Sequence, residues 1–145
     1  MASATASSPT NNTSSALAVV QKWFDTLDKS LLSETLEWNV PGYPVPKVQY
    51  IGRDDVLSHF FSDLASHFAA WDFKTTAVLP CKDGKHVAVQ GAYLPTTKKS
   101  GTKIRIPFVH IWKVEEGVIV KVDACAAFPH DLDEESKTRE STVLA

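Results

Sequence analysis

The chain has 145 residues, of which 43% are hydrophobic and 22% are charged, as is usual for a globular protein with its own core. Its 17 acidic and 15 basic side chains give a net charge of −2, so there is no basic surplus for nucleic acid or an anionic membrane surface. No apolar run approaches the ~18 residues that span a bilayer, and the two cysteines lack metal-ligand spacing, so we expect a cytoplasmic protein with reduced thiols.

The N-terminal segment is expected to be a tail followed by a helix. Residues 1–14 are rich in Ser, Thr, Asn and Ala, lack the charged and apolar regions of a secretory signal, and predict a disordered tail. Ser14 or Ser15 can cap a helix that starts near Ala16, because apolar residues then recur at helical spacing. These apolar residues are Leu17, Val20, Phe24 and Leu27.

The next segment is expected to contain a short second helix over residues 31–36 and a short strand over residues 37–40. Three prolines within residues 41–46 predict an extended loop. A third helix is expected to begin at residue 53 or 54. Its apolar stripe comprises Val56, Leu57, Phe60, Phe61, Leu64 and Phe68.

From residue 70 onward, apolar and polar residues alternate, which predicts strands. Strands are expected over residues 71–79, 86–94, 102–114 and 118–128. Helices followed by this four-strand meander predict an α+β fold, in which N-terminal helices pack over one face of a curved antiparallel sheet. A single domain of residues 15–130 would then be followed by a charged tail, residues 131–145.

His110 is the most informative residue of the predicted sheet. It shares its parity with the apolar residues Ile106, Phe108 and Trp112, so its imidazole should point to the apolar face. A titratable ring on such a face is either a hydrogen-bonded core histidine or the polar centre of a pocket.

Three segments together resemble a known family. Val-Pro-Gly-Tyr-Pro at residues 40–44 ends the first expected strand, YIGRDDVLSHFF follows at 50–61, and PFVHIWKVEEGVIVKV closes the sheet at 107–122. Over roughly residues 16–128 the chain resembles the SnoaL-like polyketide cyclases and ketosteroid isomerases of the nuclear-transport-factor-two-like superfamily. The resemblance implies a cone-shaped α+β barrel, in which helices close over a bent sheet around an apolar pocket.

The resemblance also implies places for functional residues. His110 falls near the oxyanion-stabilising acid of ketosteroid isomerases, and Trp23 and Phe60 fall near two of their pocket tyrosines. Val40 stands where those enzymes keep their general-base aspartate, so that route is not expected here. Asp123 is the nearest counterpart of the acid/base aspartate of SnoaL-like cyclases, but its parity is opposite to that of the pocket face.

Asp28 is a further catalytic candidate, at the end of the first helix. In this it resembles scytalone dehydratase, a related fold member with an aspartate there that serves a histidine. A carboxylate beside His110 would orient the ring and raise its pKa. The alternative is a solvated residue at a helix end.

The remaining candidates are pocket-wall residues. Four tryptophans in one small domain suit a flat hydrophobic ligand. His59, Asp63 and His67 have a helical spacing that could bind a metal, but we interpret them as a solvated flank of the helix. We expect neither a metal nor another cofactor. The substrate-binding candidates are Trp23, Trp38, Tyr43, Tyr50, Phe60, His67, Phe108 and Trp112.

Two functions fit these residues. One is a cofactor-free isomerase, cyclase or dehydratase that uses acid/base chemistry on a small hydrophobic carbonyl metabolite, such as a polyketide or terpenoid intermediate. The other is a non-catalytic small-ligand-binding or dimeric interaction module of the same fold. Val109, Ile111 and Ile119 lie among charges on the opposite sheet face, which predicts a homodimer.

Overall fold

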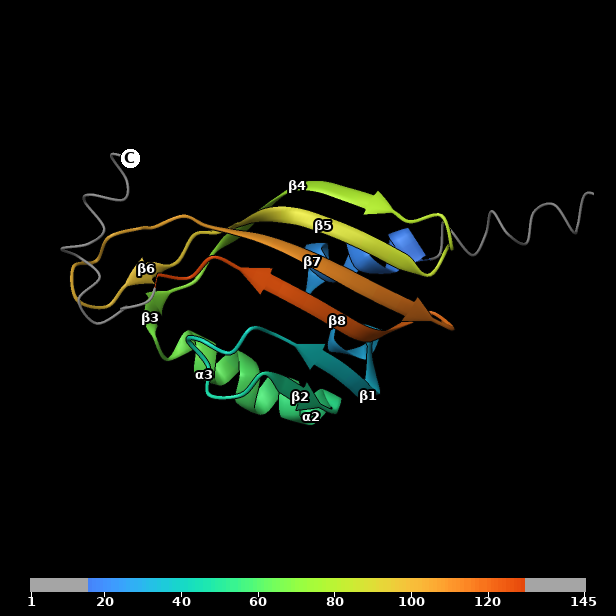
Figure 1. Ribbon diagram of the computed structural model, residues 1–145, viewed down its shortest axis with the longest axis horizontal. Coiled ribbons are helices and arrows are strands. Elements are labelled where there is room, and N and C mark those ends of the chain that lie inside the picture. The colour runs from blue at the N-terminus through green and yellow to red at the C-terminus, as the bar shows by residue number, and fades with distance from the viewer. Residues whose placement is uncertain (1–15, 130–145) are drawn as a thin grey trace, which may run out of the picture.

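A six-stranded sheet with helices on one face forms the described part of the chain, residues 16–129, in this computed structural model (Figure 1). Its strand order is β2-β1-β8-β7-β5-β4. The first helix, residues 16–26, lies behind the sheet in Figure 1. The strands are β1 (Leu32–Asn39), β2 (Gln49–Ile51), β4 (Phe73–Pro80), β5 (His86–Tyr93), β7 (Ile106–Glu115) and β8 (Val118–Ala126), with β3 (Phe68–Ala70) and β6 (Thr96–Thr97) in a separate two-stranded sheet.

The predicted α+β cone fold is confirmed, with a difference in the sheet. The strands β4, β5, β7 and β8 form the expected antiparallel arrangement. The strand β1, however, runs parallel to β8, so the sheet is mixed rather than antiparallel throughout. The strand β8 comes last in the chain and pairs with β7 on one side. The strand β1, which comes first, pairs with β8 on its other side.

The predicted helix over residues 31–36 is wrong. A single 3₁₀ turn, Lys29–Leu31, leads directly into β1. Leu32 and Leu36, both buried, are four residues apart, a spacing that suits a helix. The segment forms a strand instead, because β1 hydrogen-bonds to β2 on one side and to β8 on the other. A register shift between Leu32 and Glu37 lets both leucines remain in the core.

The predicted third helix is confirmed as far as Ala65 and contains a π-helical stretch. Phe68, expected in its apolar stripe, starts β3 instead. The helix starts after Gly52, whose φ of 98° suits glycine. It comprises α2 (Arg53–Asp55), the π-helical stretch Val56–Phe60 and α3 (Phe61–Ala65). The wider turn of a π-helix alters which side chains face inward.

The predicted alternation of the last hairpin is confirmed. The buried and exposed residues of β7 alternate, and His110 lies with the buried set at 3% exposure. The strand starts at Ile106 rather than at residue 102, although Ile104 is also buried. The inner face of the sheet therefore carries His110 toward the helices.

The predicted tails, residues 1–14 and 131–145, lie outside the described residues. Within residues 16–129, no helix has the length and apolar character needed to cross a membrane.

Candidate active site

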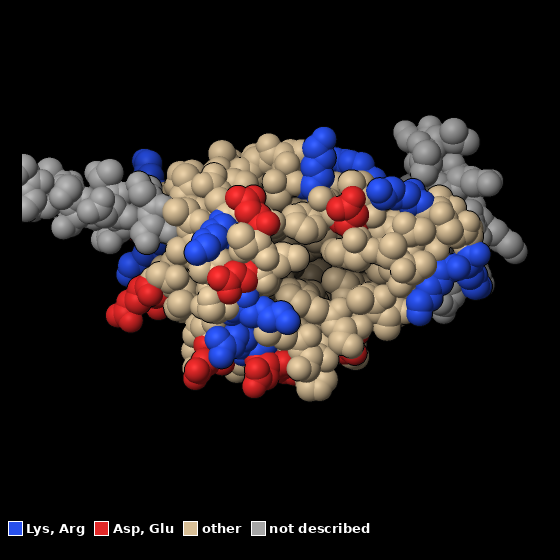
Figure 2. Space-filling view, turned by 180° about the vertical axis from the view of Figure 1, so that it is seen from behind, with Lys and Arg blue, Asp and Glu red and all other residues tan. Residues whose placement is uncertain are grey.

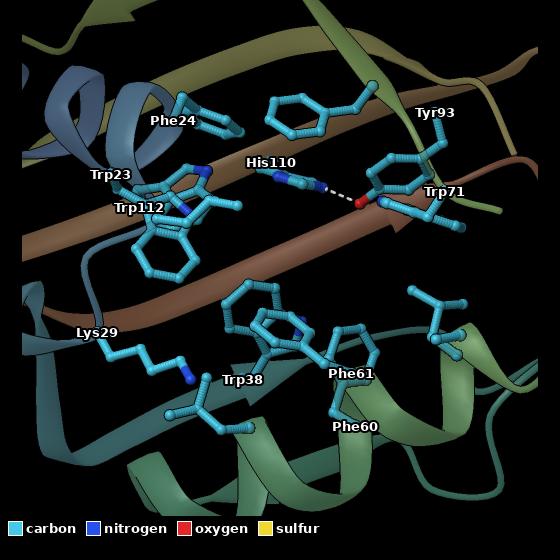
Figure 3. A pocket seen from close by; sticks show the side chains of 15 residues that line it. Trp23, Phe24, Lys29, Trp38, Phe60, Phe61, Trp71, Tyr93, His110 and Trp112 are labelled. Atoms are coloured by element: carbon cyan, nitrogen blue, oxygen red, sulfur yellow. Dashed lines mark hydrogen bonds between the residues drawn. The ribbon is translucent and has the colours of Figure 1, made fainter.

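A cavity of about 330 Å³ lies between the inner face of the sheet and the helices (Figure 3). The first helix and the turn after it contribute Trp23, Phe24, Leu27 and Lys29. The helix of residues 53–65 contributes Leu57, Phe60, Phe61, Leu64 and Ala65. The strands and the segment before β4 contribute Trp38, Trp71, Phe73, Tyr93, His110 and Trp112. The molecular face seen in Figure 2 is hollowed near its centre, with acidic and basic side chains around the hollow.

All four tryptophans of the chain line this cavity. Trp112 is the centre of the aromatic wall. Its ring centroid lies 5.6 Å from that of Trp38, nearly perpendicular to it, and 6.4 Å from that of Trp23. Such edge-to-face packing fixes the ring orientations and leaves a rigid, largely apolar surface.

A hydrogen-bonded pair, Tyr93 and His110, provides the polar centre of the wall. The Tyr93 hydroxyl oxygen lies 2.6 Å from Nε2 of His110, as the dashed line in Figure 3 shows. Val89 of β5 faces His110 of β7, and Tyr93 lies four residues farther along β5, on the same sheet face. The Phe108 ring stacks against both of them: its centroid lies 4.5 Å from that of the Tyr93 ring and 4.3 Å from that of the His110 ring. This stacking holds both polar rings in place.

Burial keeps the pair neutral. It lowers the pKa of His110 to about 3 and raises the pKa of Tyr93, because each charged form would lose its hydration. The expectation that a carboxylate raises the pKa of His110 is therefore wrong: its partner is an uncharged phenol.

Two arrangements of protons fit the short distance between Tyr93 and His110. Either the hydroxyl donates to Nε2, or a protonated Nε2 donates to the hydroxyl oxygen. The second arrangement frees the O–H of Tyr93 to donate to another group.

Three buried nitrogen atoms on cavity-lining residues have no hydrogen-bond partner within residues 16–129. They are Nδ1 of His110 and the indole Nε1 atoms of Trp38 and Trp112. A buried indole N–H without an acceptor costs about 1–3 kcal/mol relative to a paired one.

The structure does not bring Asp28 to His110. Its carboxylate accepts hydrogen bonds from the backbone N–H (3.0 Å) and the hydroxyl (2.7 Å) of Ser30, so it caps the 3₁₀ turn. The Ser30 hydrogen bonds also lower the pKa of Asp28.

Asp123 lies on the outer face of the sheet, as its parity predicts. It is exposed, and its carboxylate accepts a hydrogen bond of 2.8 Å from the Asn39 side chain. Neither Asp28 nor Asp123 lines the cavity.

The predicted wall residues divide into two groups. Trp23, Trp38, Phe60 and Trp112 line the cavity as expected. The others are placed elsewhere: Tyr50 is buried against Phe60, His67 is half-buried, and Phe108 packs behind the Tyr93–His110 pair. Tyr43 is 44% exposed and borders a separate space of about 20 Å³.

Sequence reasoning missed Tyr93 and Lys29. Tyr93 shares its parity with Val87 and Val89, which are buried on the inner face, so its direction was readable. Its distance from His110 depends on the pairing of β5 with β7, which no local pattern reveals. Lys29 could not be identified from the sequence, because the pattern around it predicts only the end of the first helix.

Of the described residues that line the cavity, Lys29 is the one that carries a charge. It is exposed, and none of the described residues forms an ion pair with it. Figure 3 places it on the opposite side of the cavity from Tyr93. As for metals, residues 16–129 contain no group of three His, Cys, Asp or Glu side chains able to hold an ion.

Comparison with solved structures finds the same fold in several proteins. A phenazine biosynthesis-related protein from Pseudomonas aeruginosa has a TM-score of 0.67 at 15% identity, over 82% of this chain and 83% of that chain. A putative SnoaL-like polyketide cyclase from Jannaschia sp. CCS1 has a TM-score of 0.65 at 13% identity, over 86% and 90%. A putative ketosteroid isomerase from Kribbella flavida DSM 17836 has a TM-score of 0.59 at 21% identity, over 81% and 82%. These identities show the fold alone.

The sequence comparisons give the family. No curated protein matches the sequence. A family model described as the SnoaL-like domain matches residues 17–122, a span that includes every strand of the large sheet except the last residues of β8. The chain therefore belongs to the SnoaL-like domain family.

Proposed function

We propose that this protein is a cofactor-free isomerase or cyclase for a small hydrophobic carbonyl compound, and that Tyr93 and His110 bind the carbonyl oxygen. The observation that carries the proposal is the 2.6 Å contact between Tyr93 and His110 at the wall of an apolar cavity. A hydrogen bond to developing negative charge is strong in such a site, because little water competes with it.

In the proposed chemistry, Nε2–H of His110 donates to the Tyr93 oxygen, and the Tyr93 O–H donates to the carbonyl oxygen. When a C–H bond next to the carbonyl breaks, its electron pair forms a C=C bond and the negative charge moves to the oxygen. The proton passes to water at the open side of the cavity. Tyr93 then stabilises the enolate, which can be reprotonated elsewhere or attack a second carbonyl.

A neutral imidazole suits this reaction better than a charged one. With its pKa lowered to about 3, His110 is uncharged at neutral pH and cannot act as a strong general base. Among the described residues, no carboxylate lines the cavity. The proposed substrate therefore has a C–H bond that is already acidic.

The absence of a lining carboxylate also favours a second candidate, a binding module without chemistry. Hydrogen exchange at the carbon next to a ketone distinguishes the two. The ketone 2-tetralone is flat, apolar and enolisable, and NMR in D₂O follows its loss of α-protons. An enzyme should accelerate exchange, and Tyr93→Phe should slow the catalysed rate about 100-fold, as removal of an oxyanion donor does. Binding of 2-tetralone without acceleration would leave only the module.

We also propose that the protein is a cytoplasmic homodimer. Cys81 and Cys125 are free, which suits a reducing compartment. Val109 is 49% exposed at the middle of β7, on the outer sheet face, where it borders a shallow space of about 300 Å³. A second copy would cover this face.

A further inference from the structure

The polar groups of the cavity wall are almost all hydrogen-bond donors. Lys29 contributes an ammonium group, and in the proposed arrangement Tyr93 contributes its O–H. In that arrangement the Tyr93 oxygen accepts from Nε2–H of His110, and Nδ1 of His110, the remaining acceptor, is buried. A ligand that fits this wall must bring acceptors of its own.

The charge of the cavity is also one-sided. In the described part of the chain, Lys29 is the one charged residue that lines the cavity, and no carboxylate there forms an ion pair with it. The lysine side chain is exposed, whereas His110 is only 3% exposed, so the positive charge lies at the rim and the neutral pair lies deep. Figure 3 shows Lys29 and Tyr93 on opposite sides of the space, with aromatic rings between them.

Local structure holds Lys29 at this rim. Asp28 caps the 3₁₀ turn of Lys29–Leu31 through Ser30. Leu27, directly before Asp28, has a φ of 55°, a left-handed conformation that is unfavourable for a residue other than glycine. Leu27 also lines the cavity while remaining 51% exposed. Strained backbone is tolerated where it positions side chains for a ligand.

We propose that the cavity binds planar, unsaturated carboxylates, with the carboxylate at Lys29 and the flat apolar part extending toward the Tyr93–His110 pair. This inference rests on the proposed function, because it names the ligand class of the same cavity. The flat apolar part of such an acid would lie among the tryptophans. The carboxylate supplies both the negative charge and the acceptors that the wall lacks.

The probes for this inference are trans-cinnamate and its neutral amide, trans-cinnamamide, which have nearly the same shape. Tryptophan fluorescence reports their binding, because all four tryptophans line the cavity. We expect cinnamate to bind about fivefold more tightly than cinnamamide, the amount that a partly exposed ion pair contributes. Lys29→Met keeps the apolar stem and should abolish this preference. Lys82→Met is the matched control, since Lys82 is exposed and does not line the cavity.

Equal affinity of the wild-type protein for the two probes would overturn the inference, as would a preference that survives Lys29→Met or no quenching by either probe. These results would not overturn the proposed function, because 2-tetralone carries no charge and its hydrogen exchange is expected to depend on Tyr93. Conversely, a cinnamate preference that requires Lys29 would support the inference even if 2-tetralone exchange were not accelerated.

Discussion

The Tyr93 hydroxyl and Nε2 of His110 lie 2.6 Å apart on two adjacent strands, although 17 residues separate them in the sequence. Both rings stack on Phe108, which belongs to the same strand as His110. The pair is thus held by strand register and by ring packing, and it needs no charged group to stay in place.

Tyr93→Phe should lower the free energy of unfolding by about 1–2 kcal/mol, because it leaves the buried Nε2 of His110 without its partner. Urea denaturation measures the change. Tyr43→Phe, at a tyrosine that is 44% exposed, is the comparison and should have a smaller effect. Equal effects of the two substitutions would mean that the Tyr93 hydrogen bond adds nothing to stability.

Below about pH 6.5, the free energy of unfolding should decrease as the pH is lowered, because of His110. The pKa of His110 is about 3 in the folded protein. In the unfolded chain it is about 6.5, so the unfolded state binds more protons between these values and stability rises with pH. Lowering the pH from 8 to 5 should reduce the free energy of unfolding by about 2 kcal/mol through this group alone. Above about pH 6.5, the pKa of this histidine in the unfolded chain, the imidazole is neutral in both states and has no effect on the free energy of unfolding.

The control for this pH dependence is His110→Gln, which keeps a polar group near Tyr93 but does not titrate. Urea denaturation at several pH values should give a shallower slope for the variant than for the wild-type protein. Parallel slopes would show that His110 titrates normally in the folded state. The other histidines contribute equally to both proteins and cancel in the comparison.

Gly91→Ala should destabilise the protein and disturb the Tyr93–His110 pair. A methyl group at Gly91 would collide with the carbonyl oxygen of Lys74 and come within 2.9 Å of the Phe108 ring. The backbone of β4 cannot move without losing its pairing with β5, so we expect a loss of about 1–3 kcal/mol. Gly101→Ala is the comparison: nothing lies within 4 Å of its added methyl group, and its φ of 67° adds only backbone strain. A Gly91→Ala variant as stable as Gly101→Ala would contradict this packing.

Val109→Glu should convert the proposed homodimer into a monomer. The substitution places a charge at the centre of the outer sheet face, between Gln90 of β5 and Cys125 of β8. Multi-angle light scattering measures the mass, and Leu79→Glu is the control, since Leu79 is also exposed (57%) but lies near the end of edge strand β4. A wild-type monomer, or a Val109→Glu dimer, would contradict the interface.

Local pattern was enough to predict strands β4, β5, β7 and β8 and the direction of His110. The strict alternation of β7 determines which side chains face inward, and β8 follows through a turn that contains Gly117. The pattern was not enough for residues 31–36, where the leucine spacing fits a helix and only pairing with distant β8 decides. Secondary structure that depends on a nonlocal partner is not encoded in its own segment.

The site was predicted in part for the same reason. The resemblance to ketosteroid isomerases identifies Trp23 and Phe60 as wall residues, and the number of tryptophans in one small domain points to Trp38 and Trp112; all four line the cavity. The partner of His110 was predicted as a carboxylate, since carboxylates usually orient imidazoles. Its actual partner, Tyr93, depends on the register between β5 and β7.

A double-mutant cycle of hydrogen exchange in 2-tetralone tests the central claim most directly, namely that Tyr93 and His110 act as one unit on a carbonyl oxygen. The four proteins are the wild type, Tyr93→Phe, His110→Gln and the double variant. If the two residues form one unit, each single substitution should remove most of the catalysed exchange, and the double variant should be no slower than Tyr93→Phe. Independent, multiplicative losses, or wild-type exchange in Tyr93→Phe, would contradict the account.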